Sequence, residues 1–201
     1  MGRVSGYEYD IFISYSRHGT VQRWLLNHFY SKLMDCLADE IAPMPRVYVD
    51  RTMPRGQHWP SNLQRALQHS KIMLQLLAPP YFESQWCMAE WQSMLERQSR
   101  LGLASVNTPQ GLICSVLYAD SDNFPMAARE VSWVDFKPFA NPDMAFQRSE
   151  DYVAFHWKVR DLARDLVALL HEVPEWQPDW PLIEKPDPVL MPPVKMPRFG
   201  R

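Results

Sequence analysis

Short apolar runs alternate along the chain with segments in which apolar residues recur every three or four positions. The first run, Tyr9–Tyr15, is rich in aromatic and β-branched residues and leads into the polar Ser16-Arg17-His18-Gly19. An apolar run of this kind is typical of a central strand that is buried on both faces. Over residues 21–41 the spacing is that of a helix, which Pro43 and Pro45 end. This order predicts a βα unit and hence a parallel sheet.

The same alternation continues to about residue 170. Further strands are predicted over residues 46–49, 71–77, 112–118 and 131–136. Helices are predicted from Ser61 to His69, from Ser84 to about Arg100, and from Tyr152 to Leu170. Between residues 123 and 146, three prolines favour loops over a well-formed helix.

The last 28 residues contain eight prolines, which exclude regular helix and central strand. This tail must be extended. It is either a free linker or a segment laid across the domain, with Trp176 and Trp180 as anchors.

Composition narrows the class of protein. With 201 residues, of which 46% are hydrophobic, the chain suits one domain with a sizeable core. A net charge of −2 gives no general attraction to nucleic acids or anionic membranes. No segment has the length of a membrane span, and residues 1–6 lack the apolar run of a secretory signal. We expect Cys36, Cys87 and Cys114 to be reduced and buried in a cytoplasmic protein.

One acidic residue is the strongest candidate for chemistry. If Ser84 caps the helix that follows it, Trp86 and Glu90 lie one turn apart on the same helix face. An indole beside a carboxylate can hold a flat ligand and stabilise positive charge on it. A helical glutamate is more often solvated, however, and a tryptophan more often packs in the core, so this spacing alone does not establish a site.

Other chemistry has less support. The six histidines lack metal-ligand spacing, and no metal site is predicted. Ser16 and Ser84 have no neighbouring histidine and acid that would suggest a hydrolase triad. The long polar loop from Asp50 to Pro60 lies between short elements, a position in which loops are often functional.

Three segments together resemble the motifs of Toll/interleukin-1 receptor (TIR) domains. Residues 9–17 resemble the first box of that family, and residues 48–59 resemble its second box and BB loop. Ser84-Gln85-Trp86-Cys87-Met88-Ala89-Glu90 resembles the Ser-x-Trp-Cys-x-x-Glu stretch of bacterial and plant TIR domains that cleave NAD. The resemblance predicts an N-terminal extension at residues 1–6, a TIR domain at 7–172 and a proline-rich tail at 173–201.

The resemblance implies an α/β fold, a flavodoxin-like three-layer sandwich. Its parallel sheet has about five strands in the order 2-1-3-4-5. Ligands of such sheets bind beyond the carboxyl ends of the strands. Here these ends are expected at residues 15–17, 50–59, 78–84 and 119–122.

The resemblance also implies an activity, that of an NAD+ glycohydrolase or ADP-ribosyl cyclase in which Glu90 is catalytic. NAD+ is then a substrate, and no cofactor is expected. Nicotinamide leaves as a neutral pyridine, so one carboxylate that stabilises an oxocarbenium-like state can suffice. The residues expected to bind the substrate are Tyr15, Arg17, Asp50 and Trp86. Loop gating or self-assembly is expected of Pro54, Arg55, Gly56 and Trp59.

The resemblance is to prokaryotic TIR effectors, which implies a role in an immune or antiphage defence pathway. The chain would be activated by TIR self-assembly, with a sensor protein that clusters the chain as a partner and no direct contact with nucleic acid or membrane. The alternative is a non-catalytic TIR adaptor that signals through homotypic contacts, and a weaker one is hydrolysis of another nucleotide. Retention of Glu90 favours the enzyme.

Overall fold

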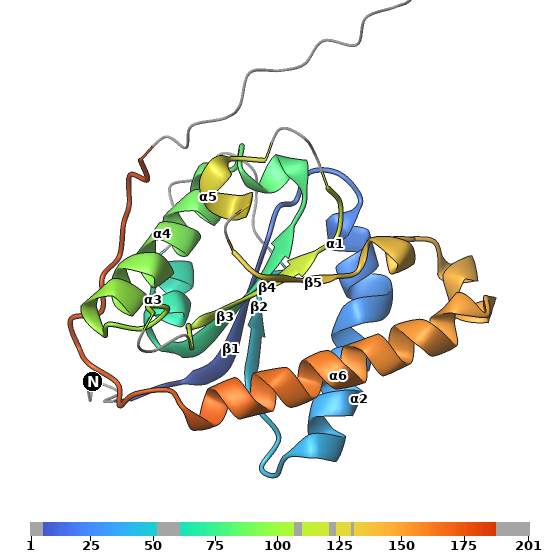
Figure 1. Ribbon diagram of the computed structural model, residues 1–201, viewed down its shortest axis with the longest axis horizontal. Helices are drawn as coiled ribbons and strands as arrows, with labels where there is room; N and C mark the ends of the chain where they lie inside the picture. The colour runs from blue at the N-terminus through green and yellow to red at the C-terminus, as the bar shows by residue number, and fades with distance from the viewer. Residues whose placement is uncertain (1–5, 52–60, 107–109, 121–123, 130, 188–201) are drawn as a thin grey trace, which may run out of the picture.

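A parallel sheet of five strands forms the centre of the molecule (Figure 1). The computed structural model describes residues 6–51, 61–106, 110–120, 124–129 and 131–187. Its strands are β1 (Tyr9–Tyr15), β2 (Val47–Val49), β3 (Ser70–Leu77), β4 (Ile113–Leu117) and β5 (Trp133–Asp135). They lie in the order β2-β1-β3-β4-β5, with every pair parallel. This topology confirms the predicted flavodoxin-like fold.

Helices cover both faces of the sheet, which gives three layers (Figure 1). One face carries α3 (Ser61–Gln68), α4 (Gln85–Arg100) and the short α5 (Met126–Arg129). The other carries α1 (Val21–Trp24), the π-helical segment η1 (Leu25–Phe29), α2 (Tyr30–Glu40) and α6 (Asp151–His171). The described residues also form three 3₁₀ turns: η2 (Pro79–Tyr81), η3 (Lys137–Phe139) and η4 (Met144–Arg148).

The first predicted helix, over residues 21–41, contains a π-helical turn that the sequence analysis did not predict. Its apolar residues at 21, 25, 29, 33 and 37 are spaced four apart, which is longer than the 3.6 residues of an α-helical turn. In a regular α-helix these positions would drift off one face. The wider turn of η1 resets the phase, so that Val21, Leu25 and Leu33 are all buried in one core.

A row of polar side chains crosses the buried centre of the sheet. Ser14 on β1 is the register partner of Gln75 on β3, and Gln75 is the register partner of Ser115 on β4. All three residues are buried, and the Ser115 hydroxyl donates a hydrogen bond of 3.1 Å to Gln75 Oε1. Buried polar groups require partners. At the β1 end of this row, the partner comes from α4.

The segment from Val173 to Asp187 lies across α3 and α4 (Figure 1). This part of the tail is therefore laid across the domain and is not a free linker. We call this segment the strap. The Trp176 indole donates to the Gln68 carbonyl (3.2 Å) and stacks on His69. Trp180 is only 3% exposed and lies over the guanidinium of Arg97, 5.0 Å from ring centroid to Cζ. Both predicted anchors therefore contact the domain.

Arg97 is a fully buried cation that the sequence analysis did not single out. Its guanidinium donates to the carbonyl oxygens of Ser70 (2.8 Å) and Leu67 (3.1 Å). Burial lowers the pKa of Arg97 to about 10. The strap thus covers a charged group that ties α4 to β3 and α3.

Two of the sequence predictions concern the proline-containing region at residues 123–146 and the three cysteines. The described residues between 124 and 148 form β5, the one-turn α5, the 3₁₀ turns η3 and η4, and loops, and they include no long helix, as the prolines suggest. The cysteines are free: Cys36 and Cys87 are buried, whereas Cys114 is only partly buried, near the amino end of β4. Among the described residues, no helix is both long and apolar enough to cross a membrane.

Candidate functional site

The candidate site lies at the carboxyl edge of the sheet, where β1, β2 and β3 end. In a parallel sheet these ends meet at one edge, so the loops after them converge. Gly19, in the loop after β1, has a φ of +78°, which favours glycine and turns the chain into α1. The loop after β3 passes through η2 and leads into α4, which brings Glu90 to the same edge.

Ser84 sets the start of α4. Its side-chain oxygen accepts a hydrogen bond of 3.3 Å from the Cys87 amide, which confirms the predicted N-cap. This start places Glu90 in the second turn on the inner face of the helix, where it is only 6% exposed. There Glu90 Oε2 lies at hydrogen-bonding distance from the Ser14 hydroxyl oxygen, 2.6 Å away.

A second hydroxyl extends this contact. Tyr81 Oη lies 2.7 Å from Ser14 Oγ and 3.2 Å from the Cys87 carbonyl oxygen, so that it is at hydrogen-bonding distance from both. Ser14 and Tyr81 are both buried. Neither residue was predicted from the sequence. The available signal was the serine in the otherwise apolar β1, since a polar side chain in a fully buried strand needs a partner.

The environment of Glu90 favours its neutral form. Burial raises the pKa of Glu90 to about 8, and the negative charge of Asp50 acts in the same direction. The Ser14 hydrogen bond and the positive charge of Arg17 oppose this rise but do not cancel it. The carboxyl group therefore holds its proton at neutral pH in the isolated chain. Within the described residues, none of the ion pairs includes Glu90.

Three of the other predicted residues meet beside Glu90. Arg17 Nη2 and Asp50 Oδ2 form an ion pair at 2.6 Å, and both side chains are largely shielded from solvent. The Tyr15 hydroxyl donates to the carbonyl oxygen of Asp50. Electrostatic interactions link Glu90 to Tyr15, Arg17 and Asp50. An acid, a guanidinium and a phenol thus stand together, a set suited to a ligand that carries phosphate and a ribose.

The remaining predicted residues are placed differently. Trp86 is half-buried and packs against the core from the first turn of α4. In the described part of the chain, the hydrogen bond of Glu90 goes to Ser14, and the ring contacts do not include Trp86. Pro54, Arg55, Gly56 and Trp59 lie outside the described residues.

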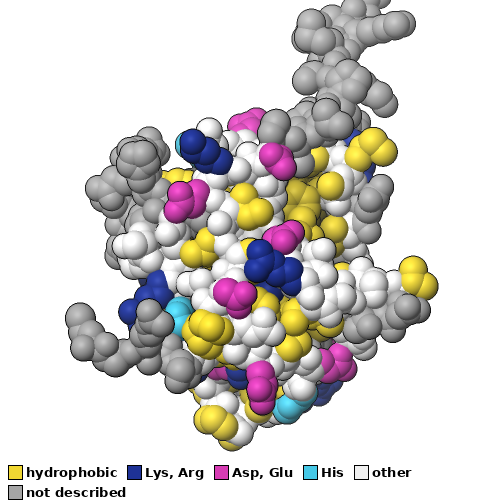
Figure 2. All heavy atoms as spheres, turned by 90° about the vertical axis from the view of Figure 1, so that its left-hand side faces the viewer, with side chains coloured by type: hydrophobic (Ala, Val, Ile, Leu, Met, Phe, Trp, Pro, Cys, Tyr) yellow, Lys and Arg dark blue, Asp and Glu magenta, His cyan; other side chains and the backbone are white. Residues whose placement is uncertain are grey.

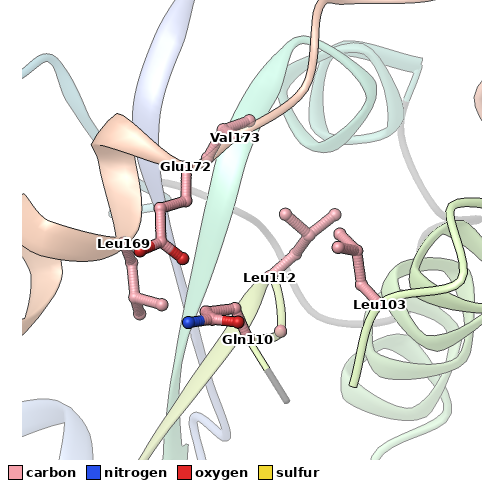
Figure 3. A pocket seen from close by; sticks show the side chains of 7 residues that line it. Leu103, Gln110, Leu112, Leu169, Glu172 and Val173 are labelled. Carbon is pink, nitrogen blue, oxygen red and sulfur yellow. The ribbon is translucent and has the colours of Figure 1, made fainter. Parts of the chain in front are cut away.

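A small hollow lies away from this edge (Figure 3). Leu112, just before β4, and Leu169, near the end of α6, form part of its wall, and the side chains of Gln110 and Glu172 approach each other across it. The hollow is thus near the amino end of β4, at the opposite edge of the sheet from Glu90. Within the described residues, no group of three or more His, Cys, Asp or Glu side chains is arranged to hold a metal ion.

A family model matches more than half of the chain, and two solved structures are similar to it. The family model described as "TIR domain" matches residues 11–149. The TIR domain of the Toll-related receptor TRR-2 from Hydra magnipapillata is 19% identical, with a TM-score of 0.47; the match covers 79% of this chain and 98% of that one. The TIR domains of the activated Roq1 resistosome are also 19% identical, with a TM-score of 0.41 and coverage of 78% and 84%. The comparison with curated proteins found no match.

Proposed function

The chain belongs to the Toll/interleukin-1 receptor (TIR) domain family, and from this premise we propose that it cleaves the bond between nicotinamide and ribose in NAD+. The family includes NAD-cleaving members as well as non-enzymatic adaptors. Glu90 would be the catalytic carboxylate. The observation that carries the proposal is the burial of Glu90 at the carboxyl edge of the sheet, beside Arg17 and Asp50.

Among the described residues Glu90 has no ion-pair partner, and burial of an acid without a cation partner is costly. This cost supports a functional role. A buried carboxyl group with a raised pKa reduces stability at any pH at which it must ionise. An amide or apolar side chain at position 90 would avoid this cost. Strongly perturbed acids of this kind are concentrated at sites of chemistry.

The chemistry of the substrate suits a single carboxylate. Nicotinamide in NAD+ is already cationic and leaves as a neutral pyridine, so no general acid is required. Positive charge develops on the ribose as the bond breaks, and an ionised Glu90 would stabilise this oxocarbenium-like state. Glu90 would also accept hydrogen bonds from the ribose hydroxyls.

The neighbouring residues have proposed roles that follow from their chemistry. Arg17 would bind the pyrophosphate, since a guanidinium matches phosphate oxygens in a bidentate manner. Asp50 orients Arg17 through their ion pair. The rings of Tyr15 and Trp86 would contact the flat parts of the substrate.

The product and setting belong to the same proposal. Water at the anomeric carbon gives ADP-ribose, and an internal nucleophile gives a cyclic isomer. We propose that the chain acts in the cytoplasm of a prokaryote, in an immune or antiphage pathway. Self-association of TIR domains would activate it, and a sensor protein would cluster the chains.

The test is incubation of the purified chain with NAD+, followed by chromatographic identification of the products. We expect nicotinamide release, and we expect Glu90→Ala to lower its rate by at least about 100-fold, as loss of a group that stabilises transition-state charge does. Glu96→Ala is the matched control, because Glu96 is a half-exposed glutamate on the same helix that pairs with Arg100. Equal rates for the Glu90 variant and the wild type would exclude the assignment.

One observation favours the second candidate, a non-catalytic adaptor. In the isolated chain Glu90 is neutral near pH 7, and its polar contact is already made by Ser14. An adaptor would show TIR self-association without nicotinamide release at any pH from acid to mildly alkaline. The same assay, carried out on the self-associated protein, therefore separates the two functions.

A further inference from the structure

Glu90, Ser14 and Tyr81 form a continuous chain of hydroxyl and carboxyl groups inside the protein. The distances are 2.6 Å from Ser14 Oγ to Glu90 Oε2, 2.7 Å from Ser14 Oγ to Tyr81 Oη, and 3.2 Å from Tyr81 Oη to the Cys87 carbonyl. Either Ser14 or Tyr81 can donate in the middle contact. The direction of the chain is therefore not fixed by the positions of its heavy atoms.

We propose that Ser14 and Tyr81 are positioning residues that form a reversible hydroxyl relay, which stabilises the ionised form of Glu90 and reverses its direction when Glu90 gains a proton. The relay acts on the carboxylate of the proposed function, and only its effect on catalysis rests on that function. Its physical basis is that each hydroxyl has one hydrogen to donate and lone pairs to accept.

With Glu90 ionised, all donors point toward the carboxylate. Tyr81 donates to Ser14 Oγ, and Ser14 donates to Glu90 Oε2. The Cys87 carbonyl, which lies within α4, then keeps its helical hydrogen bond alone. The two hydroxyls polarise each other in this arrangement, which strengthens the bond to the charged oxygen.

With Glu90 neutral, the direction reverses. The carboxyl proton on Oε2 donates to Ser14 Oγ, Ser14 donates to Tyr81 Oη, and Tyr81 donates to the Cys87 carbonyl. No donor in the chain is left without an acceptor in either state. The only proton exchanged with solvent is that of Glu90, and the hydroxyl hydrogens of Ser14 and Tyr81 rotate in place.

Other charged and titratable groups also face Glu90 from the elements around it. Asp50 and Arg17 act on it with opposite signs and are paired with each other. Three more groups feel its charge: Tyr15, Tyr48 and Cys87. Burial raises the pKa of each of them, so they are neutral over the range in which Glu90 titrates. Ser14 is thus the direct partner of Glu90 through which its state can be changed.

The first measurement follows the side-chain carboxyl carbon of Glu90 by NMR in the full chain with labelled glutamate, and Glu90→Gln identifies the signal. Ser14→Ala should raise the pKa of Glu90 by about one unit, because a hydrogen bond to an ionised group is about twice as strong as one between neutral groups. Tyr81→Phe should raise it less. Ser70→Ala and Tyr118→Phe should leave it unchanged, since each removes a buried hydroxyl that bonds elsewhere.

The second measurement tests the reversal itself. In the wild type, the backbone carbonyl carbon of Cys87 should titrate with the same midpoint as Glu90, because Tyr81 donates to it only when Glu90 is neutral. This coupled change should be lost in Tyr81→Phe. That variant keeps the aromatic ring in the core, so it tests the relay even if Ser14→Ala folds poorly.

An unaltered midpoint in Ser14→Ala, or an equal Cys87 titration in Tyr81→Phe, would overturn the relay. In the NAD+ assay, the acid limb of the pH profile should move upward in Ser14→Ala, with about a tenfold loss of rate below the limb per unit of pKa. The NMR arm does not depend on NAD+ cleavage. A chain without NADase activity but with the predicted titrations would refute the proposed function and leave the relay intact, and unchanged titrations in an active chain would do the reverse.

Discussion

At the scale of single residues, Glu90 makes the stability of the fold depend on pH. The native chain binds the Glu90 proton up to about pH 8, whereas the unfolded chain releases it near 4.5, the ordinary pKa of a glutamate. Between these values the native state binds more protons, so the contribution of Glu90 to the free energy of unfolding is full below about pH 4.5 and falls as pH rises. The pKa of Glu90 is raised, so the direction is opposite to that of a salt-bridged acid.

We therefore predict that Glu90→Gln, which imitates the neutral carboxyl group, is close to the wild type in stability near pH 5. Near pH 9 it should be more stable than the wild type by roughly 3–5 kcal/mol. Urea unfolding at the two pH values measures this difference. Glu96→Gln should show no such divergence, because Glu96 is half-exposed. A constant difference between Glu90→Gln and the wild type at both pH values would contradict the prediction.

Four of the residues predicted for the site lie together in the structure, and two of their neighbours, Ser14 and Tyr81, were not predicted. Tyr15, Arg17, Asp50 and Glu90 lie together because parallel strands share a carboxyl edge, which their pattern could predict. Ser14 is 76 residues from Glu90, and no local spacing links them. Only the tertiary packing of α4 on β1 makes that contact.

At the scale of elements, α4 is held from both sides. Its inner face presents Glu90 to β1, and its outer face is covered by the strap. Ser93 accepts a hydrogen bond of 2.8 Å from the Ile183 amide, and the Arg100 guanidinium donates to the Asp179 carbonyl. The position of Glu90 therefore depends on the strap as well as on the sheet.

We predict that Trp180→Ala lowers the free energy of unfolding by about 3–5 kcal/mol, the usual cost of removing a buried aromatic side chain. Thermal or urea unfolding at fixed pH measures it. Trp157→Ala is the matched control, because Trp157 is 53% exposed on α6, and its loss should cost far less. Equal stability of the two variants would mean that the strap does not hold the domain in solution.

Hydrophobic periodicity located most elements, and the exceptions have physical causes. Each predicted strand and long helix is present to within a few residues. The π turn in the first helix could not be predicted from the pattern alone, because a spacing of four between apolar residues is also compatible with a regular α-helix. The course of the tail stayed open because proline content excludes helix without indicating what an extended segment packs on.

At the scale of the whole molecule, the order of the strands was predicted from the resemblance to TIR motifs and not from hydrophobic periodicity. Apolar runs show that strands exist, but the order β2-β1-β3-β4-β5 depends on which way each crossover turns, and periodicity does not contain this information. On the side of the molecule that bears α3, α4 and the strap, acidic and basic side chains are interspersed (Figure 2). This distribution agrees with the net charge of −2.

The proposed activation by self-assembly gives a prediction at this scale. Nicotinamide release per chain should rise with chain concentration, because clustering would complete the site. Rates measured over a dilution series, together with sedimentation of the same samples, test this. If the loop from Asp50 to Pro60 makes the contact between chains, Arg55→Ala should weaken both association and activity. Glu90→Ala should lose activity alone. Full activity per chain in samples that sediment as monomers would contradict the coupling.

The strap also contacts the start of the described chain. The Tyr7 hydroxyl donates to the Pro174 carbonyl at 3.0 Å, and the Gly6 carbonyl lies 2.7 Å from His69 Nδ1, beside the Trp176 ring. The start of the described chain is therefore fastened next to the start of the strap, on the side of α3 (Figure 1). A tag or fluorescent protein joined ahead of Tyr7 would be tethered on this side. Helices α2 and α6 cover the opposite face of the sheet, away from such a tag (Figure 1).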